Sequence, residues 1–226
     1  MHLKRTCSPT FWPIIRKQKT WAVRPASRGF MLNESMPLLL VIRDVLGETK
    51  TLRETKKLLN QGVVTVNGKD RTDYRFPVGL FDIIHITPIK KTYIVVPSKK
   101  GIGIKETKPA SSALMKITNK VANGKDAYQY TFHNGMTINL NKSYKIGDSL
   151  VIGFDGKVQG SFEMKEGTYA VITGGRRRGA QGKITSITLP AFTGSKMVAI
   201  EGEGGSYITK YDYVFPCGKA KPEVDL

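Results

Sequence analysis

The strongest constraint on the fold is the order of segments that begins at residue 37. The run PLLLVIRDVLG, residues 37–47, is apolar almost all round. It predicts a buried helix with proline in its first turn and glycine at its end. A second helix follows at once, because Thr51 and Glu54 have capping-box spacing and Gly62 is well placed as a C-terminal cap. The chain therefore contains at least one compact helical module.

The second helix is amphipathic in the sequence. Leu52, Thr55 and Leu59 fall on one face and predict its buried side. Charges on such a helix usually mark a solvated face, which is the simplest interpretation of the opposite stripe. That stripe contains Arg53, Lys56, Lys57 and Asn60.

A short β run follows the second helix and closes on Asn67-Gly68, the dipeptide that two-residue hairpins prefer. FDIIHI, residues 81–86, predicts a later strand. The segment LRETKKLLNQGVVTVNGK, residues 52–69, resembles the small RNA-binding module named after bacterial ribosomal protein S-four. That resemblance implies two helices against a small sheet, with RNA held by Arg53, Lys56, Lys57, Lys69 and Arg71.

The first 33 residues carry seven Lys or Arg and no acidic residue. No periodicity is sustained there, so we expect an irregular basic arm that orders on binding RNA. Its aromatic residues Phe11, Trp12 and Trp21 suit stacking on unpaired bases. The alternative is a disordered solubilising tail, but such tails are usually poor in aromatic residues.

The whole chain of 226 residues is strongly basic, with a formal net charge of +18. Such an excess favours a polyanionic partner, with nucleic acid first, over a neutral solute. No apolar run approaches the roughly 20 residues that span a bilayer, and no signal-peptide pattern precedes Pro13. We therefore expect a cytoplasmic protein without a membrane partner.

Two further β regions follow. PSKKGIGIKETKP, residues 97–109, has the composition of a connector, and residues 113–163 contain β runs separated by turn signals. Lysines are spread through that central region without clustering, so a scaffold role is the default.

The stretch YAVITGGRRRGAQGKITSI, residues 169–187, predicts two strands joined by an exposed loop. Gly175, Gly179 and Gly182 would give the loop positive φ angles, and three arginines at its tip would point outward to a polyanion. GGRRRGAQGKI resembles the KOW motif, which implies a small barrel. A nucleotide-binding P-loop is not expected, because GxxxxGKS is absent and no strand-to-helix transition follows. The alternative is a loop that is merely solvated.

HLKR, RPASRGF, PLLLVIRDVL, VNGKDRTD, FHNGMTINL, VITGG and YVFPCG occur in the order seen in one family. The chain resembles the S-four-e family of archaeal and eukaryotic small-subunit ribosomal proteins. Its compact length is more similar to the archaeal members. Eukaryotic members carry a less basic loop after VITGG, so the RNA role of the three arginines is inferred from charge alone.

The resemblance implies an α+β, multi-domain structural protein of the small ribosomal subunit in the cytoplasm. Its partners would be small-subunit ribosomal RNA and neighbouring ribosomal proteins, with no small-molecule substrate. The expected segments are a basic arm (1–36), an S-four-like domain (37–96), a central β domain with its linker (97–165) and a KOW-type barrel with a tail (166–226). The candidate RNA-binding residues are His2, Lys4, Arg5, Arg16, Lys17, Lys19, Arg24, Arg28, Arg53, Lys56, Lys57, Lys69, Arg71, Arg176, Arg177 and Arg178.

Enzymatic, metal and cofactor roles find little support in the sequence. Cys7 and Cys217 are far apart, and His2, His85 and His133 lie in no ligand-spaced cluster. RNA-modifying enzymes also carry the helical module, but each needs a large catalytic domain that does not fit here. A free elongation factor with a KOW barrel remains an alternative. The acidic residues that could suggest an active site, Asp126, Asp148 and Asp155, lie in turn-like sequence.

Overall fold

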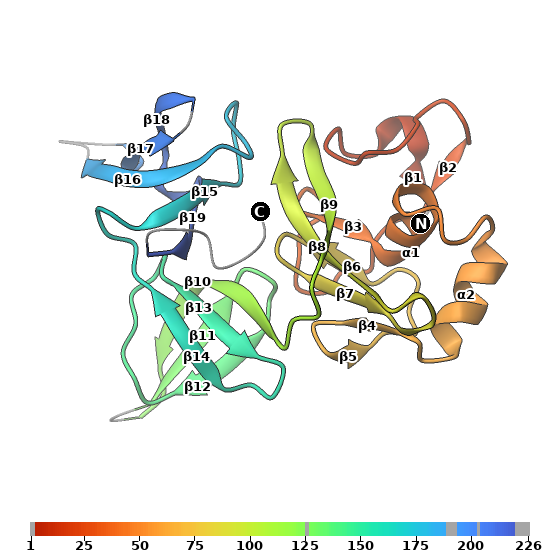
Figure 1. The fold of residues 1–226 in the computed structure, drawn as a ribbon, viewed down its shortest axis with the longest axis horizontal. Helices are drawn as coiled ribbons and strands as arrows, with labels where there is room; N and C mark the ends of the chain where they lie inside the picture. Colours follow the sequence, from red (N-terminus) through yellow and green to blue (C-terminus); the bar gives the residue numbers. More distant parts are fainter. Residues whose placement is uncertain (1–2, 125–126, 189–193, 203, 220–226) are drawn as a thin grey trace. The chain divides into compact units, whose positions relative to one another are not determined.

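The computed structural model describes all residues except 1–2, 125–126, 189–193, 203 and 220–226 (Figure 1). The chain divides into two compact units. The first contains the described residues up to Val96 together with Lys100–Ala113, and the second contains Pro97–Lys99 and the described residues from Leu114 onward. The fold is mixed and sheet-rich, and its α-helical content is small.

The first unit packs its helices against a sheet with the strand order β5-β4-β7-β8-β9. Two separate two-stranded sheets accompany it, one formed by β3 and β6 and the other by β1 and β2. The strands are β1 Leu3–Lys4, β2 Trp21–Ala22, β3 Ser35–Pro37, β4 Val64–Val66, β5 Lys69–Asp70, β6 Pro77–Gly79, β7 Ile83–Ile86, β8 Lys91–Ser98 and β9 Gly101–Thr107. The helices are η1 Arg5–Cys7, α1 Leu38–Leu40, η2 Val41–Val45, α2 Leu52–Asn60 and η3 Thr87–Ile89.

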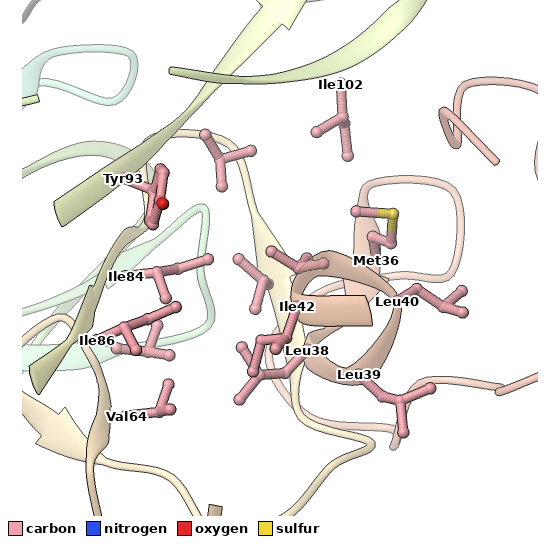
Figure 2. Packing of buried hydrophobic residues seen from close by; sticks show 14 of the residues in the cluster. Met36, Leu38, Leu39, Leu40, Ile42, Val64, Ile84, Ile86, Tyr93 and Ile102 are labelled. Carbon is pink, nitrogen blue, oxygen red and sulfur yellow. The ribbon is translucent and has the colours of Figure 1, made fainter. Parts of the chain in front are cut away.

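The first predicted helix is buried, as expected. It starts as α1 after Pro37, which lies at the N-cap, and continues as the π-helical segment η2. Leu38, Leu39, Leu40 and Ile42 are all fully buried. In Figure 2, Leu38 and Ile42 point toward the strands that carry Ile84 and Ile86, whereas Leu39 and Leu40 lie on other sides of the helix. A helix surrounded by protein needs apolar side chains all round.

The second helix and the hairpin follow the sequence closely. Thr51 and Glu54 form the expected capping box, and Gly62 follows the helix with a φ of +68°. Asn67 and Gly68 both have positive φ, and Val66 pairs with Lys69 across the turn. These local predictions are confirmed. The cap depends on two side-chain hydrogen bonds, and Gly62, Asn67 and Gly68 occupy positions with positive φ, which glycine and asparagine adopt at low cost.

The N-terminal segment packs onto the first unit. Trp12 is 2% exposed, and its indole N–H donates to the Ser35 carbonyl at 2.8 Å. The backbone N–H of Ile102 in β9 donates to the Phe11 carbonyl at 3.1 Å. The expectation that this arm orders only on binding RNA is therefore wrong. Trp12, from a loop, and Ala22, from the two-residue strand β2, bury apolar surface. Elements this short show no periodicity in the sequence.

Residues 97–109 are mostly strand, and the expectation of a connector there is wrong. β8 and β9 are neighbouring strands joined by a short turn at Lys99 and Lys100, and Gly101, the first residue of β9, has a φ of +136°. Ile102 is buried and Ile104 packs against the same core. The lysines and glycines of this segment suggested a connector. The alternation of Ile102 and Ile104 is the better indication, because it is typical of a strand with one buried face.

The second unit contains two sheets, with strand orders β12-β11-β10-β13-β14 and β18-β17-β16-β15-β19. All of the pairings that involve β15–β19 are antiparallel, and their core includes Ile172, Ile184, Val198 and Ile200. The strands are β10 Ser112–Ala122, β11 Tyr128–Phe132, β12 Thr137–Leu140, β13 Ser149–Gly153, β14 Val158–Phe162, β15 Tyr169–Ile172, β16 Gln181–Thr188, β17 Met197–Gly202, β18 Gly205–Lys210 and β19 Val214–Gly218. The short helix η4 spans Tyr211–Tyr213.

Lys116 joins the two sheets of this unit. Its ammonium group donates to the carbonyls of Asp212 at 3.0 Å and Val214 at 2.7 Å. Burial lowers the pKa of Lys116 to about 8, while the nearby Asp212 charge acts to raise it. The expected domain boundary at residues 165 and 166 falls inside this unit.

Candidate nucleic-acid interface

Two arginines of the N-terminal segment bind groups of the protein itself. Arg5 is 1% exposed and forms an ion pair with Asp44 at 3.1 Å. Burial alone would raise the pKa of Asp44, but the guanidinium groups of Arg43 and Arg5 lower it below its usual value. Because a buried charge needs a partner, Arg5 is committed to this pair and is not available at the surface.

Arg16 binds the backbone of its own segment. Its guanidinium donates to the carbonyls of Thr6 at 3.2 Å, Ser8 at 3.0 Å and Pro9 at 2.8 Å. Five fixed donors allow one arginine to satisfy several carbonyls of an irregular loop. Arg5 and Arg16 therefore explain how a segment with little regular structure is held in one conformation.

The other cations of this segment lie at the surface. Lys4, Lys17, Lys19 and Arg28 are exposed, and Arg24 is half-buried. His2 lies outside the described residues. All these cations were predicted from the sequence to bind RNA. The structure separates those that bind groups of the protein from those that are exposed to solvent.

The polar stripe of α2 is at the surface, as predicted. Arg53, Lys56 and Lys57 are exposed, and Thr55 and Leu59 are fully buried. The prediction that Leu52 is buried is wrong, since 37% of it is exposed. As the first residue of the helix, Leu52 projects over the cap rather than over the core.

Lys69 and Arg71 follow the hairpin and differ in environment. Lys69 is exposed, while Arg71 is half-buried with its guanidinium 4.2 Å from the centre of the Phe76 ring. Burial lowers the pKa of Arg71, although the nearby carboxylate of Asp82 acts in the opposite direction. A stacked arginine keeps one face of its guanidinium for a second ligand.

Asp82 is a buried carboxyl group below this hairpin, with 3% exposure. It accepts hydrogen bonds from the Asn67 amide at 2.7 Å and from the Gly79 N–H at 2.8 Å. Burial raises the pKa of Asp82 to about 6, against the lowering effects of those two bonds and of Arg71. The carboxylate thus fixes the turn that carries Lys69.

The arginine loop connects β15 and β16, which pair as the sequence predicts. Arg176 and Arg177 are exposed, and Arg177 lies 5.2 Å from the centre of the Tyr207 ring. Arg178 is half-buried, so the expectation that all three guanidinium groups point outward is wrong. The loop therefore exposes two arginines to solvent, and the third is partly covered by the protein.

Gly175 and Gly179 have positive φ angles of 78° and 84°, as expected of the loop. Gly182 does not, and this prediction is wrong. It lies buried in β16, where an added Cβ would approach the Glu201 carbonyl to 2.2 Å. Close contact between neighbouring strands, and not turn geometry, requires glycine there.

The central sheet holds a group of lysines and tyrosines that the sequence did not indicate. The Lys120 ammonium lies 4.0 Å from the centre of the Tyr128 ring and donates to the Ser143 hydroxyl at 2.7 Å. The Tyr130 hydroxyl donates to the Lys142 carbonyl at 3.0 Å and fixes the same loop. Lys142 and Lys145 are exposed on it. The alternation of Tyr128 and Tyr130 along β11 was the available signal.

The cysteine, histidine and acidic side chains decide whether the chain could hold a metal ion. Within the described parts of the chain, no group of three His, Cys, Asp or Glu side chains could hold a metal ion. The Cys217 thiol is buried, which raises its pKa to about 12, and Cys7 is exposed. His85 lies on the strand surface beside the Thr92 hydroxyl at 3.0 Å. No helix of the described structure is long and apolar enough to span a membrane.

Two of the acids considered above as possible active-site residues have structural positions. Asp148 is buried and accepts from the backbone N–H groups of Lys145 at 3.0 Å and Met164 at 2.9 Å. Asp155 lies in the turn between β13 and β14. Asp126 is outside the described residues. Both described acids therefore have the turn positions that their sequence context predicted.

Comparisons with known proteins agree along the whole chain. Residues 1–27 match the RS4NT (NUC023) domain, and residues 89–158 match the ribosomal family S4e. Small ribosomal subunit protein eS4 of Methanosphaera stadtmanae is 37% identical over 100% of this chain and 95% of its own length. The protein of the same name from Staphylothermus marinus is 35% identical, with the same coverage of both chains.

A solved structure is similar as well. The crystal structure of the 30S ribosomal protein S4e from Thermoplasma acidophilum superimposes with a TM-score of 0.71 at 30% identity. The match covers 83% of this chain and 96% of that one. Full-length similarity to these relatives, together with the matching sheet-rich fold, shows that the chain belongs to the S4e family of ribosomal proteins.

Proposed function

We propose that the chain is a structural constituent of the small ribosomal subunit that binds small-subunit ribosomal RNA. The observation that carries the proposal is the arrangement of charge. The net charge is +18, and the exposed cations come from the N-terminal segment, α2, the hairpin and the arginine loop. Relatives that match the whole chain are named small ribosomal subunit protein eS4. Neutralised phosphates and the shape of folded RNA would supply affinity and specificity.

The proposed contact surface is smaller than the set of basic residues suggested by the sequence. Arg5 is buried in its ion pair, and the half-buried Arg16 donates to backbone carbonyls of its own segment, so neither is counted as a direct contact. Arg24, Arg71 and Arg178 are half-buried and are not counted among the direct contacts. The residues proposed to contact RNA directly are Lys4, Lys17, Lys19, Arg28, Arg53, Lys56, Lys57, Lys69, Arg176 and Arg177.

The finer domain assignment belongs to the same proposal. Residues 37–96 would act as an S-four-like RNA-binding module and residues 166–226 as a KOW-type module. Capped helix α2 with its hairpin supports the first assignment, and the glycine-flanked loop between β15 and β16 supports the second. The protein would act without catalysis, in the cytoplasm, beside neighbouring ribosomal proteins and ribosomal RNA.

Sedimentation through a high-salt cushion tests this function. The tagged full-length chain, expressed in its own host, should remain with small subunits after a wash that removes loosely bound factors. Its recovery there, in about one copy for each subunit, would match the proposal. Release of the whole pool into the soluble fraction would instead favour a free RNA-binding or elongation factor.

A further inference from the structure

The two tryptophans of the N-terminal segment have opposite environments. Trp12 is 2% exposed and hydrogen-bonded inside the first unit, whereas Trp21 is 53% exposed. Trp is highly buried on average, so an indole with half its surface in solvent usually marks a contact site when its position is fixed. The structure therefore assigns different roles to these two residues.

The backbone that carries Trp21 is fixed. Strand β2 pairs with β1 so that Trp21 lies opposite Lys4, and Ala22 lies opposite Leu3. The preceding residue is held as well, because the Thr20 carbonyl accepts from the Arg5 N–H at 2.9 Å. Ala22 is buried, which anchors the strand from below. Binding to Trp21 would therefore not require ordering of a flexible tail.

The surroundings of Trp21 are cationic. Lys4 is exposed on the paired strand, and Lys19 is exposed two residues before the tryptophan. The nearby carboxylate of Asp44 is already engaged by Arg5 and Arg43, and the first 33 residues contain no acid. A ligand suited to this place combines negative charge with a flat apolar surface.

We infer that Trp21 stacks on an unpaired base of ribosomal RNA while Lys4 and Lys19 neutralise the phosphates beside it. This inference rests on the proposed function and names the chemistry of one contact within it. Bases inside an A-form duplex have both faces covered, so the contact requires a single-stranded loop, bulge or end. Indole stacking accepts any base, and the site would therefore add affinity rather than sequence preference.

Affinity measurements test the contact. Ribosomal RNA extracted from salt-stripped small subunits is the probe, and filter binding gives the affinity at several salt concentrations. Trp21→Ala should weaken binding on the order of 10-fold, and Trp21→Phe should remain within about 3-fold of the unaltered chain, because a ring is retained. The slope against salt should not change, since no charge is removed.

Ile15→Ala is the matched control. Ile15 belongs to the same segment and is 68% exposed, so its truncation removes a large apolar group without removing a stacking surface. It should leave affinity unaltered. Thermal unfolding of each variant shows whether the fold is retained. Equal affinities for Trp21→Ala and Ile15→Ala would overturn the inference.

Intrinsic fluorescence gives an independent readout, because Trp12 and Trp21 are the two tryptophans of the chain. RNA should quench the emission of the unaltered protein, and the quenching should disappear in Trp21→Phe, which retains buried Trp12. Persistent quenching in that variant would overturn the inference.

Two further outcomes separate the possible partners. If Trp21→Ala kept its affinity for RNA but was lost from washed subunits, a protein neighbour would be the occupant and the inference would be wrong. Failure of the unaltered chain to bind ribosomal RNA would contradict the proposed function itself, and the inference would fall with it.

Discussion

At the scale of single residues, burial decides what each charged group does. Arg5 and Lys4 are adjacent in the sequence, yet Arg5 is buried against Asp44 and Lys4 is exposed. The same division separates Arg178 from Arg176. Side chains of the same charge are therefore covered by the protein at one position and exposed at a position close by.

Asp82 makes stability depend on pH. Its folded-state pKa of about 6 lies above its ordinary value of 3.8 because the carboxyl is buried. Between these values the folded protein holds a proton that the unfolded chain has released, so stability falls as pH rises from about 4 to 6. The contribution that is lost is roughly 3 kcal/mol from a shift of about two pKa units.

Thermal or urea unfolding of the free protein at pH 4.5 and 7.5 measures this effect, with Asp82→Asn as the reference. The unaltered chain should gain stability relative to Asp82→Asn when the pH is lowered from 7.5 to 4.5. The quantity compared is the free energy of unfolding of each protein at each pH. A difference that is independent of pH would show that Asp82 does not titrate in this range.

At the scale of secondary-structure elements, the sequence predicts best where one residue type controls a local conformation. The capping box of α2, Gly62 and the Asn67-Gly68 turn are all found as predicted. The N-terminal segment could not be predicted in this way. Its order depends on contacts between residues distant in sequence, such as Trp12 with Ser35, and on arginines that bind backbone carbonyls.

The candidate site shows the same limit. The sequence identified the exposed residues of α2 because a helical period separates its faces. It did not distinguish Arg5 from Lys4, or Arg178 from its neighbours, because burial in loops has no period. The group around Lys120 was missed for a related reason. Its members come from β10, β11 and the loop after β12, which only strand pairing brings together.

The two faces of α2 should respond differently to truncation. Leu59→Ala removes a fully buried side chain and should lower the free energy of unfolding by roughly 2 to 5 kcal/mol. Arg53→Ala combined with Lys57→Ala removes exposed charges and should change it by less than about 1 kcal/mol, while weakening binding to ribosomal RNA. Denaturant unfolding and filter binding provide the two readouts. Equal stability losses would mean that the faces are wrongly assigned.

The packed N-terminal segment leads to a prediction about stability. Trp12→Ala should destabilise the first unit by roughly 3 to 5 kcal/mol, because it empties a buried position and leaves the Ser35 carbonyl without its indole donor. Deletion of residues 1–33 should also lower the unfolding temperature. Trp21→Ala serves as the control and should have little effect. An unaltered transition after the deletion would show that the segment does not pack against the core.

At the scale of the whole molecule, we expect the contacts with RNA to come from exposed basic residues on the folded surface of the protein. The arrangement of the two units on RNA is not needed for this claim, because each unit presents its own exposed cations. The first presents those of α2, and the second presents those of the arginine loop. Affinity should then decline with salt in proportion to the phosphates that these side chains neutralise.

The most direct test is the salt dependence of binding to small-subunit ribosomal RNA. Two variants with equal charge loss are compared. One replaces Arg53, Lys57, Arg176 and Arg177 with alanine, and the other replaces exposed lysines outside the proposed surface, Lys99, Lys105, Lys108 and Lys157. The first variant should flatten the slope of log affinity against log salt by about 3, at roughly 0.7 to 0.9 per contact, and the second by less than about 1. Equal slopes in the two variants would contradict the account. They would mean that binding depends on the net charge of the protein and not on the positions of these four residues.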